Sequence, residues 1–380
     1  VRSFMNSDCS DSSLRTLKSI PAPKSLLSIC HAKFSGCSFA CSNAGEWSGP
    51  ISRRYAVRVR SSEEVPRRRV VGETVLDVRP PGHAPLFSIV IALFNSEHTL
   101  GTTLASFDAQ LLSQDKVEFI IVNDGSSDRS LEVALSWGNG RSNTVILDKP
   151  HGGIASTRNA ALREARGKWI TAVDPDDLIS PRYLSEVATF LECDSTDRLV
   201  LLSTRVMPTR DVDGRFSANH PLDGKFRSGN RMASLLCEPG AFAIGATTFL
   251  RLAKVEDFGL QFDDRVSPTF EDGNFILRYL CHFEEPLVGL VASAHYFYRR
   301  SSAGTSAVQS GWSQSTKYSH QVEYGYLGAL QYAMERTHGV PDWMAHAICY
   351  DLMPYFKENL RFNSSSQRVS GDLGSNFLGL

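Results

Sequence analysis

The sequence has no long hydrophobic run, no excess of one charge sign and few cysteines, and each absence removes a class of protein. Its 380 residues hold 40 Lys and Arg against 41 Asp and Glu, a formal net charge of −1. The chain therefore lacks the positive excess of a dedicated nucleic-acid binder. No apolar stretch is long enough to cross a bilayer, so membrane contact is expected to be peripheral at most. Eight cysteines in this length exclude a disulfide scaffold.

Residues 1–85 differ from the rest of the chain in charge and pattern. They contain 13 basic and 7 acidic residues, whereas residues 86–380 contain 27 basic and 34 acidic. No helical or strand period persists there, and Ser and Arg are frequent. Cys37 and Cys41 have the spacing of a zinc-ligand pair, but no second pair follows, which favours ordinary thiols. We interpret residues 1–85 as a mostly disordered basic leader.

Short apolar runs alternate with helical patterns from residue 86 onward. Strands are predicted at residues 86–93, 117–122, 144–147, 168–173 and 198–203, with helices between them. This alternation with short links is typical of a mostly parallel sheet covered by helices on both faces. Ligands of such sheets bind beyond the carboxyl ends of the strands. The residues directly after each strand are therefore the first candidates for a functional site.

Three carboxylates, Asp174, Asp176 and Asp177, directly follow the strand predicted at 168–173. Their mutual repulsion is costly unless a cation neutralises it, and Mg²⁺ or Mn²⁺ commonly takes one or two carboxylates together with substrate phosphates. Alternatively, Asp176 or Asp177 caps the helix predicted to start at Pro181. The two readings are evenly balanced for these residues taken alone.

Two further segments suit a nucleotide. Asn123-Asp124-Gly125-Ser126-Ser127-Asp128 forms a tight turn that offers carboxylate and hydroxyl groups to a base or ribose. In residues 151–159 the glycines allow close approach, and Arg158 lies about one turn into a helix, near the end that favours anions. Glu271 and Asp272 begin a predicted amphipathic helix, where they serve the helix dipole, a chemical role, or both.

In this order and at these strand ends, the motifs resemble those of the family 2 glycosyltransferases. The resemblance spans about residues 86–300 and implies an α/β fold of the GT-A, Rossmann-like type, a mostly parallel sheet with helices on both faces. It suggests a leader at 1–85, a GT-A domain at 86–305 and a C-terminal helical extension at 306–380, which we expect to be truncated. The segments that carry it are IALFNSEHTL (91–100), VNDGSSDRS (122–130), GGIASTRNAALREARGKWITAVDPDDLISP (152–181) and FEDGNFILRYL (270–280).

The resemblance also implies roles for single residues. Asp124 would hydrogen-bond the nucleobase, typically uracil, and Arg158 would hold the diphosphate. Asp174 and Asp176 would bind Mn²⁺ or Mg²⁺, and Asp174 and the adjacent Asp177 would contact the substrate. Asp272 of the Glu271-Asp272 pair would act as general base. Ala92, Phe94, Asn95 and Glu97 would border the nucleotide, and Arg299 and Arg300 would face the diphosphate unless they are exposed arginines of an edge strand.

The expected function is metal-assisted, inverting transfer of a sugar from a nucleotide-sugar, a UDP-sugar by preference, to a hydroxyl of a cell-envelope or polysaccharide acceptor. A glycan, a polyol phosphate or a lipid-linked molecule would serve as acceptor, and residues 210–245 are expected to shape its pocket. We expect the protein in the cytoplasm, where the inner face of the cell membrane is one possible place. The alternative is a non-catalytic protein of the same fold that binds nucleotide-sugars or acts as a scaffold.

Overall fold

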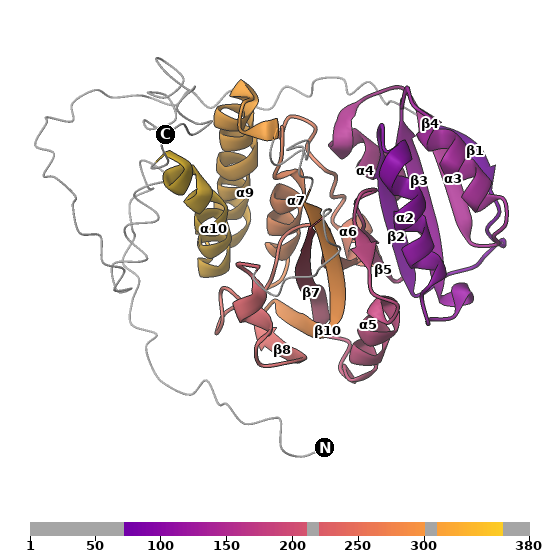
Figure 1. Ribbon diagram of the computed structural model, residues 1–380. Coiled ribbons are helices and arrows are strands. Elements are labelled where there is room, and N and C mark those ends of the chain that lie inside the picture. Colours follow the sequence, from indigo (N-terminus) through magenta and orange to yellow (C-terminus); the bar gives the residue numbers. More distant parts are fainter. Residues whose placement is uncertain (1–71, 211–219, 301–309, 360–380) are drawn as a thin grey trace, which may run out of the picture.

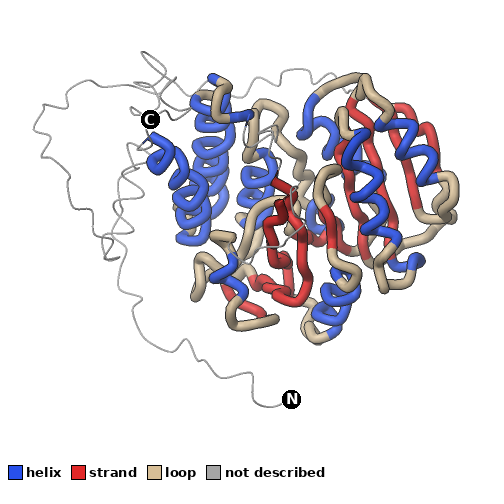
Figure 2. The backbone as a smooth tube through the Cα atoms, viewed as in Figure 1, coloured by secondary structure: helices blue, strands red, loops and turns tan. Residues whose placement is uncertain are grey.

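The computed structural model describes residues 72–210, 220–300 and 310–359, and Figures 1 and 2 show them as ribbon and tube. Within this part of the chain, ten strands form one sheet in the order β1-β4-β3-β2-β5-β9-β7-β10-β6, with β8 beside β10. The strands are β1 (Glu73–Asp77), β2 (Phe87–Leu93), β3 (Val117–Asp124), β4 (Thr144–Lys149), β5 (Trp169–Ala172), β6 (Leu178–Ile179), β7 (Leu199–Arg210), β8 (Arg231–Ser234), β9 (Thr248–Arg251) and β10 (Leu287–Arg300).

The predicted strands correspond to β2, β3, β4, β5 and β7. The four neighbours β4, β3, β2 and β5 are parallel, while β9 joins β5 to β7 by antiparallel pairs. In the register of β2 with β3, Leu93 at the end of β2 lies opposite Asn123 near the end of β3. The carboxyl ends of the central strands therefore meet at one edge of the sheet, as the α/β prediction requires.

Side chains of the sheet alternate between two cores because successive strand residues point to opposite faces. On β3, Phe119 and Ile121 pack into one core, and Ile120 and Val122 into the other. Helices thus cover both faces, as predicted. The first core is covered by α2 (Glu97–Asp108), α3 (Ser130–Gly138) and α5 (Tyr183–Glu192), and the second by α4 (Gly153–Glu164), α6 (Leu252–Asp257), α7 (Glu271–Leu280), α9 (Gly328–Thr337) and α10 (Asp342–Asn359).

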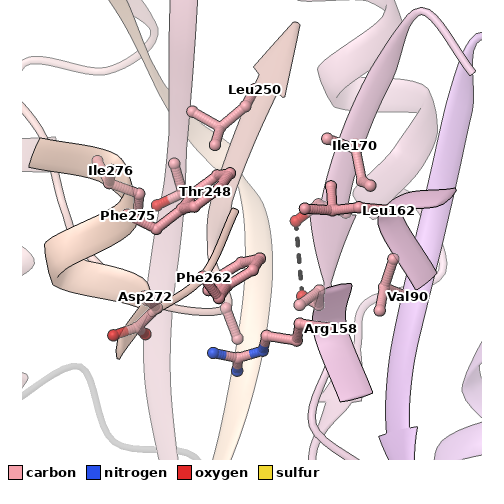
Figure 3. A pocket seen from close by; sticks show the side chains of 14 residues that line it. Val90, Arg158, Leu162, Ile170, Thr248, Leu250, Phe262, Asp272, Phe275 and Ile276 are labelled. Atoms are coloured by element: carbon pink, nitrogen blue, oxygen red, sulfur yellow. Dashed lines mark hydrogen bonds between the residues drawn. The ribbon is translucent and has the colours of Figure 1, made fainter. Parts of the chain in front are cut away.

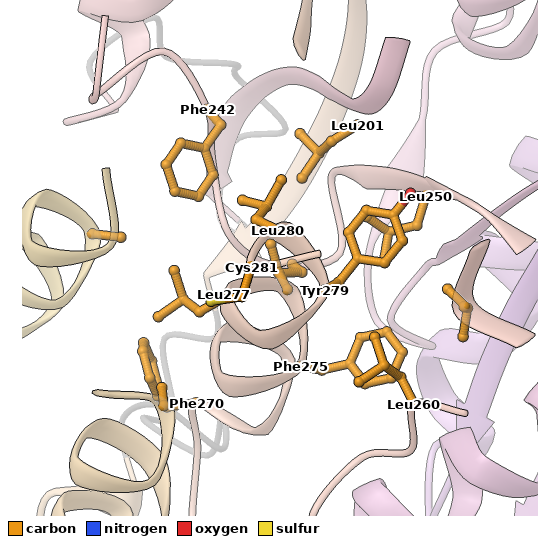
Figure 4. Packing of buried hydrophobic residues seen from close by; sticks show 14 of the residues in the cluster. Leu201, Phe242, Leu250, Leu260, Phe270, Phe275, Leu277, Tyr279, Leu280 and Cys281 are labelled. Atoms are coloured by element: carbon orange, nitrogen blue, oxygen red, sulfur yellow. The ribbon is translucent and has the colours of Figure 1, made fainter. Parts of the chain in front are cut away.

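The C-terminal helices share the second core with the sheet. Figure 4 shows α7 at its centre, with Phe275, Leu277 and Leu280 turned in different directions into apolar contacts. Trp343 and Ile348 of α10 belong to the same cluster, and Figure 1 places α9 and α10 beside α7, on the opposite side of the molecule from α2 and α3. The region predicted as an extension therefore packs as part of the main body.

Some predicted boundaries were wrong. β1 pairs with β4 at the edge of the sheet, so the sheet begins about a dozen residues before the boundary set at 85. Four of its five residues are exposed, which explains why no apolar pattern marked it. The helix predicted to begin at Pro181 begins at Tyr183. In the predicted helical extension, residues 315–337 form η3 (Ser315–Tyr318), η4 (Gln321–Leu327, a π-helix) and α9.

Two further 3₁₀ turns complete the described elements, η1 (Gln114–Lys116) and η2 (Asp223–Phe226). The interpretation of residues 1–71 as a basic leader lies outside the described residues. Among the helices that the structure describes, none combines the length and apolar character needed to span a membrane.

Candidate functional site

A cavity of about 600 Å³ opens at the carboxyl edge of the parallel strands, where ligands of such sheets bind. One side, which we name the strand-edge wall, is formed by residues at the ends of β2, β3 and β5 and at the starts of α4 and α7. The opposite side, named the helical wall, comes from η2, η3 and α10. The strand-edge wall contains the predicted residues Ala92, Phe94, Asp124, Arg158, Asp174, Asp176, Glu271 and Asp272.

Arg158 is the central cation of the strand-edge wall. Its side chain is 6% exposed, and Nη1 donates a hydrogen bond of 2.5 Å to Oε1 of Glu271. Nη2 lies 3.6 Å from Oδ1 of Asp174. Burial by itself lowers the pKa of Arg158, but the charges of Glu271, Asp272 and Asp174 outweigh it and raise this pKa overall. The guanidinium therefore stays charged inside the protein.

Burial also affects the partner of Arg158. Loss of hydration raises the pKa of Glu271 to about 7, although the adjacent Arg158 opposes the shift. Glu271 is buried and paired with Arg158, whereas Asp272 beside it is partly exposed on the cavity. Of the acidic pair, Asp272 is thus the more accessible member.

A small apolar pocket of about 60 Å³ lies behind these charges. Figure 3 shows the guanidinium of Arg158 and the carboxylate of Asp272 at one end of it, with the ring of Phe262 next to the guanidinium and Leu250 farther in. Asn159 fixes the backbone of Phe262 by two hydrogen bonds of 2.9 and 2.8 Å. This arrangement holds the start of α4 against the segment that leads to α7.

The backbone before Asp272 is strained. Phe270 is buried with a φ of 78°, a left-handed conformation that is rare for an aromatic residue. Its ring lies over Gly273, where an added Cβ would come within 2.5 Å of the ring carbon Cε2. Nδ2 of Asn274 donates to the carbonyls of Tyr324 (3.1 Å) and Gly325 (3.0 Å) in η4. The first turn of α7, and with it Asp272, is therefore fixed from both sides.

The three carboxylates after β5 separate into two kinds. Asp174 and Asp176 line the cavity, and the side chain of Asp174 is 37% exposed. Partial burial, with repulsion from Asp176 and Asp272, raises the pKa of Asp174 to about 6. Asp177 is buried, and burial raises its pKa well above the usual range.

The substrate contact predicted for Asp177 is not what the geometry shows. Its oxygens accept hydrogen bonds from the hydroxyl of Tyr296 (2.8 Å) and the backbone N–H of Arg299 (2.7 Å), both on β10. Asp177 thus holds the turn that presents the other two carboxylates. Arg299 is absent from the described cavity wall, and the side chain of Arg300 lies outside the described residues.

The strand-edge wall fits a divalent cation that takes part of its ligands from the substrate. Among the described residues, no group of three or more His, Cys, Asp and Glu side chains could hold a metal by itself. Two carboxylates that face a cavity beside an arginine are the donor set that Mg²⁺ or Mn²⁺ takes when substrate phosphates supply further ligands. Asp174 and Asp176 therefore suit a cation shared with a diphosphate.

The carboxylate of Asp124, predicted to hydrogen-bond the nucleobase, is engaged by groups of the protein itself. It is buried, and Lys149 Nζ together with the N–H groups of Gly152 and Gly153 (2.9 Å each) donates to its carboxylate. His151 Nδ1 lies 2.9 Å from Oδ2. These contacts use the acceptor capacity of a carboxylate. Asp124 thus positions the start of α4 rather than presenting a free oxygen to a base.

An aromatic pair beside Asp124 was missed. Phe94 is 45% exposed on the cavity, and its ring centroid lies 4.5 Å from that of His151, a residue for which no role was predicted. Asn95 and Glu97, predicted to border the nucleotide, are absent from the described wall. They accept the backbone N–H groups of Ser127 and Arg129 at 2.9 Å each, and so tie the loop after β2 to the loop after β3.

The helical wall contains residues that sequence analysis did not single out. The prediction that residues 210–245 shape a pocket is supported by Leu222, Lys225 and Phe242, while residues 211–219 lie outside the described part. The apolar residues of α10 have the spacing of a core helix, and several of them are buried in the second core. The helix also turns polar groups to the cavity. These are His346, Tyr350, Asp351 and Tyr355, together with Lys317 of η3.

The model of glycosyl transferase family 2 matches residues 88–251. The resemblance stated from the motifs is thereby confirmed for this part of the chain. The crystal structure of Staphylococcus aureus TarS 1-349 shares the fold, with a TM-score of 0.52 at 17% identity over 77% of this chain and 80% of that one. The GT-A fold prediction is thus confirmed.

Two curated relatives come from Bacillus subtilis. Minor teichoic acid biosynthesis protein GgaA is 28% identical over 282 residues, which cover 73% of this chain and 61% of GgaA. Minor teichoic acid biosynthesis protein GgaB is 25% identical over 268 residues, covering 70% of this chain and 29% of GgaB. The chain therefore spans less than two thirds of either relative.

Proposed function

We propose that the protein transfers a sugar from a UDP-sugar to a hydroxyl of a teichoic-acid-type cell-wall polymer, with inversion at the anomeric carbon. The observation that carries the proposal is the strand-edge wall, where Arg158, the pair Asp174 and Asp176, and Asp272 face one cavity. The names of GgaA and GgaB support the polymer class, as does that of the relative TarS, a poly(ribitol-phosphate) beta-N-acetylglucosaminyltransferase. TarS has been crystallised with UDP and with UDP-GlcNAc, which supports the donor class.

Asp272 acts as the general base in this mechanism. It takes the proton of the acceptor hydroxyl while that oxygen attacks the anomeric carbon and the bond from this carbon to the UDP oxygen breaks. The electron pair of the broken bond leaves with UDP. Because the displacement is direct, no protein nucleophile is needed, and Asp272 is the more exposed member of its acidic pair.

The donor is held by the rest of the strand-edge wall. Arg158 stays charged and offers its guanidinium to the diphosphate, where negative charge builds up as UDP leaves. Asp174 and Asp176 would hold Mn²⁺ or Mg²⁺, which supplies further positive charge to the diphosphate. The exposed ring of Phe94 offers a stacking surface for the uracil.

Release of UDP from a panel of UDP-sugars, measured with Mn²⁺ and a poly(ribitol phosphate) acceptor, tests the proposal. Asp272→Asn should reduce transfer about 10²-fold to 10⁴-fold, the range for loss of a general base. The matched control is Asp257→Asn on α6, which removes an exposed carboxylate paired with Lys254. Full turnover by Asp272→Asn would overturn the mechanism.

A non-catalytic scaffold that binds nucleotide-sugars is the rival function. Tight UDP binding by calorimetry, with no donor consumed with any acceptor tested, would favour it.

We also propose that the glycosyltransferase works in the cytoplasm, at the inner face of the membrane. Cell fractionation with an antibody against the chain checks that location.

A further inference from the structure

We propose that Lys225 forms an anion subsite in the helical wall, which binds a phosphodiester group of the acceptor polymer. The identity of the acceptor rests on the proposed function. The subsite itself rests on the charge and geometry of the wall, and it can be measured by binding without any transfer reaction.

The cations that line the cavity differ in their partners. Arg158 is paired with Glu271 at 2.5 Å. Lys317 lies in the field of the buried Asp351, and its Nζ is 3.4 Å from Oγ1 of Thr269. Lys225 has no carboxylate of the described residues within 4 Å. Lys225 is therefore a positive charge on the cavity wall that no described acid neutralises.

Lys225 is held in one position although it has no counter-ion. Its Nζ donates to the carbonyls of Gly240 (2.7 Å) and Phe242 (2.6 Å). An ammonium group has three N–H donors, so one donor is left after these two bonds. The ring of Tyr350 on α10 lies 5.7 Å from Nζ. A fixed ammonium with one spare donor, next to an aromatic ring, is suited to a phosphate oxygen.

The burial of this charge is costly without a ligand. Loss of hydration lowers the pKa of Lys225 to about 8, and no attraction from an acid offsets the shift. The neutral side-chain amide of a glutamine could donate to the two carbonyls without the cost of burying a charge. A bound anion instead restores the missing counter-charge, which explains why a lysine in this place is useful.

Lys225 also stands where the main cavity meets a second one of about 460 Å³, since Lys225 and His346 line both. The His346 ring packs against Gly240, where a Cβ would come within 2.9 Å of Cε1. In the second cavity, Glu238 is paired with Arg231 at 2.8 Å, and Asp342 adds an acid. We therefore assign the phosphate to Lys225 itself, with polymer units extending to both sides.

The experiment is calorimetric binding of two ribitols joined by one phosphodiester, compared with free ribitol, in saturating UDP and Mn²⁺. UDP and Mn²⁺ occupy the diphosphate site, so the probe reports on the helical wall. The unmodified protein should bind the phosphodiester about tenfold more tightly than ribitol, the order of one charge-assisted hydrogen bond. Lys225→Gln should remove that preference, and Lys225→Arg should restore most of it.

Lys254→Gln is the control, since it removes a lysine that is 45% exposed on α6. It should keep the full preference. Equal binding of phosphodiester and ribitol to the unmodified protein would overturn the subsite, as would an undiminished preference in Lys225→Gln. UDP affinity in the same samples reports whether each variant folds. If the preference is present while no UDP-sugar is ever consumed, the subsite stands and the proposed function fails.

Discussion

The two walls of the main cavity differ in whether their charged side chains have oppositely charged partners. In the strand-edge wall the charged groups hold one another: Arg158 is bound to Glu271, and the carboxylate of Asp124 is enclosed by Lys149 and backbone N–H groups. In the helical wall Lys225 is fixed by carbonyls and has no described acid within 4 Å. The first wall is preorganised before any ligand arrives, whereas the second leaves a charge for its ligand to neutralise. If the two proposals hold, donor binding and acceptor choice depend on different physical arrangements.

Removal of Arg158 should disturb the strand-edge wall most. Arg158→Met leaves Glu271 buried without its partner, and breaking such a pair costs about 3–5 kcal/mol. The free energy of unfolding from urea titration should fall by this amount, and UDP binding should be lost. The double variant Arg158→Met with Glu271→Leu should recover much of the stability but none of the binding. If the single variant is as stable as the unmodified protein, the charges of this wall are not mutually dependent.

A methyl group at Gly273 should have the next largest effect. Gly273→Ala would push the added Cβ into the ring of Phe270, 2.5 Å away, and overpacking of this kind costs about 1–3 kcal/mol. Transfer should fall with stability because Asp272 precedes this residue. The control is Gly101→Ala on the exposed face of α2, where no atom lies within 4 Å. Gly101→Ala should stabilise the protein by about 0.5–1 kcal/mol. A loss of stability in this control would mean that the effect of Gly273→Ala cannot be assigned to the Phe270 ring.

The stacking surface for the base gives a smaller effect. Phe94→Ala should raise the dissociation constant of UDP about fivefold, consistent with about 0.5–1.5 kcal/mol for an aromatic pair. Phe94→Tyr keeps the ring and should bind UDP like the unmodified protein. Calorimetry measures both. Unchanged affinity in Phe94→Ala would place the uracil elsewhere.

A pH titration tests the helical wall with the smallest expected change. Binding of the phosphodiester probe should fall about fivefold between pH 7 and 9, because Lys225, with a pKa of about 8, loses its proton in this range. The neighbouring groups of α10 should not contribute. Burial and the charge of Lys225 lower the pKa of His346, and burial raises that of Tyr350, so both stay neutral. Lys225→Arg should show a flat profile, and a slope that persists in this variant would exclude Lys225 as its source.

The location of a residue could be predicted where it follows from a place near the end of a strand, whereas the roles given to these residues stay predictions. Arg158, Asp174 and Asp176 were predicted because strand, turn and helix signals fix which edge of the sheet they occupy. The buried role of Asp177 was not predictable, since it depends on Tyr296 and on the backbone of Arg299, more than a hundred residues later in the chain. Three adjacent carboxylates look alike until a distant strand selects among them.

The helical wall was hidden for another reason. The spacing of apolar residues in α10 is that of a core helix, and α10 is indeed packed in the second core. A helix at the margin of a core can also border a cavity, and periodicity alone does not separate the two situations. Lys225 lies in a turn-rich segment without any motif. Its significance comes from an absence of nearby acids, which only the folded arrangement shows.

The double hydrogen bond from Asn274 to η4 has a mechanical consequence. Tyr326 of η4 donates at 2.6 Å to Asp351 of α10, so α7, η4 and α10 are connected by direct hydrogen bonds. We expect these helices to move as one rigid body, carrying Asp272 and the acceptor together. Any opening that admits a polymer would then run along the seam between α7 and α4. The ion pair of Arg158 and Glu271 connects α4 to α7 across that seam, so it would have to break for the seam to open.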